Sequence, residues 1–284
     1  MPESVKSPSP WVRFALVLRA ILFGLLIGMV AANVWPVLLL SLGAPAAAAL
    51  ELAFLAAYIF WAAGGGPPRK LRTARAECFR LRPLSGRDWL WGLIAAVSFA
   101  ATVHAAIVLL FRLVPYPAAS FHHGYDFSFI PSRTMQWLAC VVSAISAAVC
   151  EETGFRGYMQ QPIERSRGPA IAILISSLFF TLIHLTKDWA LIGMVPIVFG
   201  AGLLLGWMAR AAGTLVFGII GHAIMDVGLF AYWWTQIAGV FAQKPIPQAG
   251  IDTSFVVECA VFALLISLVV LSIRRLRGAT GFRV

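Results

Sequence analysis

The chain has 284 residues, of which 60% are hydrophobic and only 12% are charged, and its formal net charge is +10. About a quarter of the residues of a soluble globular domain are charged, so this composition excludes an ordinary soluble domain and indicates a polytopic membrane protein. The excess of basic residues does not indicate nucleic-acid binding, because no basic face with interleaved aromatic residues is present. The expected fold is all-α, a membrane helix bundle that forms a single integral membrane domain over residues 1–284.

About eight apolar segments follow one another along the chain. Each is continuous rather than alternating, which favours membrane-spanning helices over a closed barrel. Their approximate ranges are 20–40, 44–63, 90–114, 134–156, 168–186, 190–209, 213–234 and 254–273. The first resembles the apolar part of a signal peptide but is longer than such a part, so we interpret it as a retained span.

The basic residues are distributed unevenly between the predicted loops. If the N-terminus is cytoplasmic, only four of the 22 Lys and Arg residues fall on the outer side, namely Arg112, Arg133, Lys187 and Lys244. The cytoplasmic side then includes Lys6 in the N-terminal arm and Arg283 in the tail. The positive-inside rule therefore predicts that both termini are cytoplasmic. The compact form of the chain favours a bacterial source, so we expect the inner (plasma) membrane of a bacterium.

Ionisable side chains at membrane depth are costly, by about 3 kcal/mol each on insertion scales, and usually mark a functional site. Three predicted spans within the core 134–234 carry them in regular spacing. The candidates are Glu151, Glu152 and Arg156 in the fourth span, His184 with Phe180 in the fifth, and His222 with Asp226 in the seventh. By contrast, Glu51 and Glu258 lie near outer boundaries, where we expect Glu51 to snorkel, and we interpret His104 as a packing residue.

The candidate residues are expected at one level of the bundle. Glu151 lies about 15 residues before the hairpin tip near Ser166, and His184 lies about 18 residues after it, so their depths differ by only about 5 Å. Antiparallel helices joined by a short connection normally pack together. His222 and Asp226 reach a similar level from the seventh span. Three helices are therefore predicted to bring polar groups into one layer.

The spacing of these residues also divides their roles. Glu152 and Arg156 are four residues apart and can form an ion pair, whereas Glu151 is rotated by about 100° and can face a cavity. His222 and Asp226 share the same spacing and can form a hydrogen bond.

A carboxylate beside an imidazole in a dry pocket can hold and deprotonate a water molecule. A second imidazole can stabilise a developing oxyanion, and Phe180 can wall the imidazole of His184. These are parts of a peptide hydrolase without a Ser or Cys nucleophile. The residues alone leave alternatives open, because intramembrane charge pairs also serve as structural contacts or transport relays. A proton-coupled membrane transporter and a catalytically silent maturation or immunity partner are the two rivals.

Three short motifs resemble those of one known family. The stretches EETGFR (151–156), FTLIH (180–184) and HAIMD (222–226) resemble, in order, the EExxxR, FxxxH and HxxxN/D motifs of the CPBP family. This family, also called Abi, comprises CAAX-protease and bacteriocin-processing intramembrane proteases of the glutamic type, related to type II CAAX prenyl endopeptidases. The resemblance covers about 100 residues, and the eight-span layout is similar too.

The resemblance implies a role for each candidate residue. Glu151 and His184 would activate the water that attacks the peptide carbonyl, while Glu152 and Arg156 would support or position them. His222 and Asp226 would form the oxyanion site. An ionised Asp226 has no proton to donate, so it would have to be protonated, or to orient His222 or hold it protonated.

The resemblance also bears on cofactors and partners. Two Glu and two His residues could bind zinc by ligand type, with Glu151, His184 and His222 as the ligands. We favour an enzyme without a metal, because no HExxH helix is present and the family's structural picture fits a glutamate-activated water. The expected partners are the lipid bilayer and a peptide or membrane-protein substrate, with no nucleic acid; the oligomeric state is left open.

Overall fold

The structure is a computed structural model that describes residues 9–122, 127–187 and 193–277. Lys6, Arg283 and residues 190–192 of the predicted sixth span lie outside these ranges. The first half contains α1 (Pro10–Ala32), α2 (Val34–Leu42), α3 (Ala44–Ala62), the 3₁₀ turn η1 (Arg69–Leu71), α4 (Arg72–Cys78), α5 (Gly86–Leu113) and α6 (Ala118–His122). The second half contains α7 (Arg133–Glu151), the π-helix η2 (Glu152–Met159), α8 (Gln160–Arg167), α9 (Pro169–His184), α10 (Val195–Ala212), α11 (Val216–Gly228), the π-helix η4 (Leu229–Trp234), α12 (Ile246–Ala249) and α13 (Thr253–Arg277).

These elements confirm the predicted all-α membrane bundle. Within the described residues there is no strand, and seven helical stretches are long and apolar enough to cross a membrane. They are Pro10–Leu42, Ala44–Ala62, Gly86–Leu113, Arg133–Arg167, Val195–Ala212, Val216–Trp234 and Thr253–Leu276. The shorter apolar helix α9 occupies the place of the predicted fifth span.

The first span differs from its predicted range of 20–40. It begins at Pro10 and is interrupted at Asn33, where α1 ends and α2 begins. Pro36 has no N–H to donate to the carbonyl four residues earlier, which weakens the helix at this point. The Asn33 side chain donates a hydrogen bond to the Met29 carbonyl oxygen at 2.7 Å and helps to satisfy the end of α1.

The fourth span does not end near residue 156 as predicted. The helix continues through η2 and α8 to Arg167. Polar residues are tolerated there because protein rather than lipid surrounds them. In the apolar 18-residue stretch of this span, 72% of the residues are buried inside the molecule, compared with 17% in that of Thr253–Leu276. The fourth span is therefore the central element of the bundle, whereas α13 lies at its periphery.

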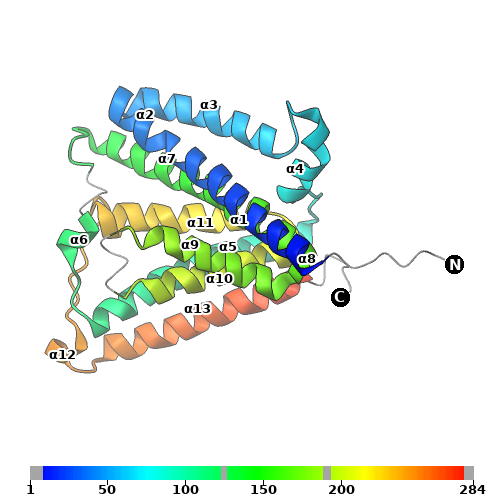
Figure 1. Ribbon diagram of the computed structural model, residues 1–284. Helices are drawn as coiled ribbons and strands as arrows, with labels where there is room; N and C mark the ends of the chain where they lie inside the picture. Colours follow the sequence, from blue (N-terminus) through cyan, green and yellow to red (C-terminus); the bar gives the residue numbers. More distant parts are fainter. Residues whose placement is uncertain (1–8, 123–126, 188–192, 278–284) are drawn as a thin grey trace.

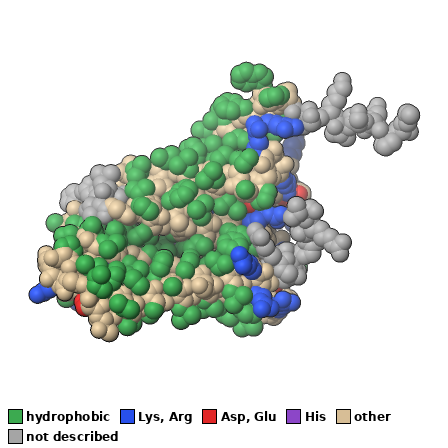
Figure 2. All heavy atoms as spheres, turned by 90° about the horizontal axis from the view of Figure 1, so that it is seen from below, with side chains coloured by type: hydrophobic (Ala, Val, Ile, Leu, Met, Phe, Trp, Pro, Cys, Tyr) green, Lys and Arg blue, Asp and Glu red, His purple; other side chains and the backbone are tan. Residues whose placement is uncertain are grey.

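The helices are arranged around this central span (Figure 1). Helices α1 and α3 pack against α7 and η2 on one side, and α11 and α9 contact them on the other. Beyond α11 lie α5 and then α13. Apolar side chains cover much of the face seen in Figure 2, and Lys and Arg residues gather at one end of the molecule. Figure 1 shows the start of α1, α4, α8 and the end of α13 at one end.

Close contact between α1 and η2 depends on glycine. A Cβ atom added at Gly154 would lie 2.6 Å from both the Gly24 carbonyl oxygen and the Gly28 Cα atom. Real Cβ atoms do not approach backbone this closely, so any side chain at this position would push the two helices apart. The glycines thus allow α1 to hold the segment that begins with Glu152.

We expect Gly154→Ala to lower the free energy of unfolding by about 1–3 kcal/mol, the usual cost of overpacking a tight contact. Thermal melting of the purified protein in detergent measures the effect. Gly200→Ala in α10 is the matched control, because a Cβ atom there meets nothing within 4 Å. Equal melting temperatures for the two variants would show that the close α1–η2 contact does not determine the stability of the protein.

The structure corrects the expectation that Glu51 snorkels. The Glu51 side chain is fully buried in α3, and its Oε1 atom accepts a hydrogen bond of 2.6 Å from the Ser146 hydroxyl of α7. The contact between α3 and α7 places this carboxylate against the neighbouring helix instead of the headgroup layer. A residue's distance from the predicted end of a span did not reveal that another helix covers it.

Candidate active site

The predicted site residues come together around one cavity of about 90 Å³ within the bundle. Its polar lining consists of Glu151 at the end of α7, His184 at the end of α9, and His222 and Asp226 of α11. Phe180 also lines it, and the other walls are apolar. A water molecule occupies about 30 Å³ in the liquid, so the space suits a few waters beside these groups.

Glu152 and Arg156 form the expected ion pair in η2. Glu152 Oε1 lies 2.9 Å from an Arg156 guanidinium nitrogen, and neither side chain has any exposed surface. Arg156 also donates to the Gly202 carbonyl oxygen of α10 at 3.3 Å, and its guanidinium lies 4.3 Å from the centre of the Phe180 ring. The arginine therefore joins three elements around the site.

Glu152 has a second partner that the spacing did not predict. Its Oε1 atom lies 3.0 Å from His222 Nδ1, which can donate a hydrogen bond to it. His222 and Asp226, which their spacing allows to pair, are further apart: His222 Nε2 lies 3.5 Å from Asp226 Oδ2, an ion-pair distance if the ring is protonated. The contact with Glu152 of η2 therefore holds the His222 ring at Nδ1, and Nε2 faces the cavity.

The carboxylate of Glu151 lies near His222 Nε2, the ring nitrogen that does not face Glu152. Its Oε2 atom is 3.9 Å from His222 Nε2. This oxygen is buried and has no hydrogen-bond partner in the part of the chain that the structure describes. A buried carboxylate oxygen is normally satisfied by a protein group or by an ordered water. The separation leaves room for a water that bridges the two groups.

His184 approaches the cavity from α9. Its Nδ1 atom lies 2.7 Å from the Phe180 carbonyl oxygen. A carbonyl oxygen can only accept, so Nδ1 carries the proton, and in the neutral ring Nε2 is the acceptor. The Phe180 ring centre lies 4.7 Å from that of His184 and 5.9 Å from that of His222. Phe180 thus packs against both imidazoles, and its contact with His184 is the one that their four-residue spacing made possible.

The sequence did not indicate what the apolar walls of the site are or where they come from. Helix α10 contributes Ile197, Val198 and Ala201, and Trp234 of η4 also lines the cavity. These residues belong to uninterrupted apolar runs, so no local pattern distinguishes them from lipid-facing neighbours. The π-helical form of η2 was also missed; such segments are frequent at functional sites.

His104 of α5 remains outside the cavity lining. Its Nε2 atom lies 3.1 Å from the Met225 carbonyl oxygen, and its Nδ1 atom accepts a hydrogen bond from the Trp233 indole at 3.2 Å. Both contacts join α5 to α11 and η4. They fit the interpretation of His104 as a packing residue.

Zinc binding was the alternative considered for this site. Among the residues that the structure describes, no three His, Cys, Asp or Glu side chains are placed to hold a metal ion together. Zinc ligands lie about 2.0–2.3 Å from the metal, and several must converge on one point. His222 Nδ1 is directed at Glu152, so Nε2 is the ring nitrogen that faces Glu151 and Asp226.

The fold and the site define an integral membrane protein with a buried cavity lined by carboxylates and imidazoles. Residues 133–228 match a protein-family model described as type II CAAX prenyl endopeptidase Rce1-like. The match spans α7 to α11 and includes all three motifs, so it confirms the resemblance to the CPBP (CAAX protease) family. At the level of the family, it supports a CAAX-type intramembrane protease. Neither the curated proteins nor the solved structures gave a match.

Proposed function

We propose that the protein is an intramembrane endopeptidase that uses a water molecule activated by Glu151 and His184. The observation that carries this proposal is the position of Glu151 Oε2: it is buried, it has no hydrogen-bond partner among the described residues, and it lies beside the His222 imidazole in a cavity that His184 also lines. Within the same described residues, Glu51 and Glu152 each also have one oxygen without a hydrogen-bond partner, but of the three only the Glu151 carboxylate lines the cavity, where a water can reach it. The match to the Rce1-like family model supports the same activity.

In the proposed reaction, a water in the cavity that Glu151 and His184 both line attacks the carbonyl carbon of the scissile peptide. Glu151, with His184 as the second acceptor, takes the proton as the new C–O bond forms. The tetrahedral intermediate then breaks its C–N bond, and the same proton passes to the leaving nitrogen. The products are a carboxylic acid and an amine, so no covalent enzyme intermediate is needed.

His222 is proposed to stabilise the negative oxygen of this intermediate. Because Nδ1 faces Glu152, only Nε2 can donate into the cavity, and it does so only when both nitrogens carry protons. Glu152 and Asp226 lie beside the two nitrogens and favour the positively charged ring electrostatically. Asp226 would therefore act by holding His222 in its charged form, and need not donate to the oxyanion itself.

The substrate is proposed to be a peptide or a segment of a membrane protein, because the cavity lies inside the bundle. The distribution of Lys and Arg supports cytoplasmic termini, and we propose a bacterial plasma membrane as the location.

Comparison of protein termini in membranes tests the activity directly. Membranes that contain the wild-type protein are expected to show new N-termini that are absent from membranes with Glu151→Gln, at equal amounts of folded protein. Mass spectrometry identifies the cleaved sequences. Identical termini in both membranes, with biological function retained, would favour a catalytically silent membrane partner; flux of a solute in liposomes that lack any peptide substrate would favour a transporter.

We also propose that activity does not depend on a bound metal. Purified protein is expected to contain less than stoichiometric zinc and to keep its cleavage rate after treatment with a chelator. Elemental analysis and a cleavage assay before and after chelation provide the measurement. Activity that is lost on chelation and restored by added zinc would contradict the proposal and would point to Glu151, His184 and His222 as ligands.

A further inference from the structure

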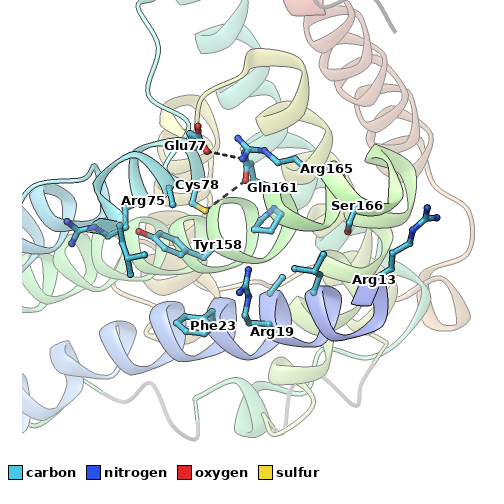
Figure 3. A pocket seen from close by; sticks show the side chains of 15 residues that line it. Arg13, Arg19, Phe23, Arg75, Glu77, Cys78, Tyr158, Gln161, Arg165 and Ser166 are labelled. Carbon is cyan, nitrogen blue, oxygen red and sulfur yellow. Dashed lines mark hydrogen bonds and ion pairs between the residues drawn. The ribbon is translucent and has the colours of Figure 1, made fainter. Parts of the chain in front are cut away.

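A second, larger hollow lies away from the catalytic cavity. Its volume is about 730 Å³, and it lies between α1, α4 and α8 (Figure 3). It is found at the end of the bundle where Lys and Arg residues gather, which the positive-inside rule predicts to be cytoplasmic. None of the residues proposed to take part in cleavage lines it.

The hollow has an excess of positive charge. Four arginines line it, Arg13, Arg19, Arg75 and Arg165, together with one carboxylate, Glu77. Arg165 is paired with Glu77 at 2.8 Å. Arg75 donates to the carbonyl oxygens of the 65–67 turn and lies 4.9 Å from the centre of the Trp61 ring, so its role is to hold that turn.

Arg13 and Arg19 of α1 have no such partners. Neither forms an ion pair or a side-chain hydrogen bond with any residue that the structure describes. Figure 3 shows Arg19 directed from α1 into the space below Tyr158 and Gln161. Two cations are thus available to an anionic group that enters from the membrane surface.

The rest of the lining is apolar and extends into the span. Leu16, Ala20 and Phe23 follow one another along α1, and Leu71 and Tyr158 lie on the facing side. Ten residues of helix rise about 15 Å, so when Arg13 lies at the headgroup level, Phe23 lies well inside the hydrocarbon layer. Burial raises the pKa of the Cys78 thiol in the same hollow to about 11, so this thiol stays protonated and does not make the hollow a nucleophilic site.

We propose that this hollow binds an anionic phospholipid, with its phosphate near Arg13 and Arg19 and the upper part of its acyl chains along Leu16 and Phe23. Basic pockets between membrane helices on the cytoplasmic side are suited to acidic headgroups. A soluble anion would use only the arginines, whereas a lipid accounts for both the charge and the apolar wall.

Native mass spectrometry of the delipidated protein in detergent tests the proposal. Dioleoylphosphatidylglycerol and dioleoylphosphatidylcholine have the same acyl chains and differ in headgroup charge. We expect the first to bind at least about tenfold more tightly, and Arg13→Gln/Arg19→Gln to remove this difference. The matched control is Arg69→Gln/Arg87→Gln, which removes two exposed arginines outside the hollow and is expected to preserve the difference.

Three results would overturn the proposal. Equal affinity of the wild-type protein for the two lipids would do so, and this measurement does not depend on any variant folding. A loss of affinity in the control that equals the loss in the Arg13/Arg19 variant would show only general attraction by surface charge. Binding of glycerol 3-phosphate as tight as that of phosphatidylglycerol would identify a site for a free phosphate group instead of a lipid.

Discussion

Glu151→Gln is expected to reduce the rate of peptide cleavage by about 10²- to 10⁴-fold, the usual contribution of a general base. Glutamine has nearly the same shape as glutamate but cannot accept the proton of the attacking water at neutral pH. The cavity should keep its form, because Glu151 Oε2 has no protein hydrogen bond to lose within the described residues. The measurement is turnover of a peptide identified from the membrane comparison, with purified protein in detergent.

Glu51→Gln is the matched control for this experiment. Glu51 is also a buried carboxylate within a span, but it contacts Ser146 and does not line the catalytic cavity. It is expected to keep near wild-type turnover. If Glu151→Gln cleaves as fast as Glu51→Gln while both proteins are folded, the role proposed for Glu151 is wrong.

Arg156→Met is expected to lower the free energy of unfolding by about 3–5 kcal/mol, because it removes the guanidinium that neutralises the buried Glu152 and leaves only the His222 imidazole beside that carboxylate. Both side chains of this ion pair are completely buried, so water cannot solvate the remaining carboxylate. The contact with the Gly202 carbonyl oxygen is lost as well. Unfolding in mixed detergent micelles, followed by circular dichroism, measures the difference.

Two further variants separate this effect from a general loss of arginine. Arg165→Met breaks an exposed pair, in which the Arg165 and Glu77 side chains are 58% and 44% exposed, and should cost less than about 1 kcal/mol. Glu152→Gln/Arg156→Met leaves no unpaired charge at the position and should recover part of the lost stability. Equal losses for Arg156→Met and Arg165→Met would mean that the buried pair contributes no more than the exposed one.

Much of the site could be read from spacing. Glu152 and Arg156 form the predicted pair because residues four apart remain neighbours on the same helical stretch, even though η2 is π-helical. The depth argument placed Glu151 and His184 in one layer, and both line the same cavity. What could not be read was the partner of His222: the spacing indicated its own-helix neighbour Asp226, but Glu152 from another helix is closer.

The same distinction holds for the fold. The sequence alone determined the approximate positions and the order of the apolar helices and the residues of the three motifs, because hydropathy and helical spacing are local properties of the chain; the ends of the first and fourth spans differ from the prediction. Only the tertiary structure decided that Glu51 is buried against Ser146, that α1 meets Gly154, and which ring nitrogen of His222 faces the cavity. These outcomes depend on how helices distant in the chain pack and rotate against one another. A periodic pattern carries no information about the distance or angle between two helices, so the chemistry of the site became visible only when they were placed together.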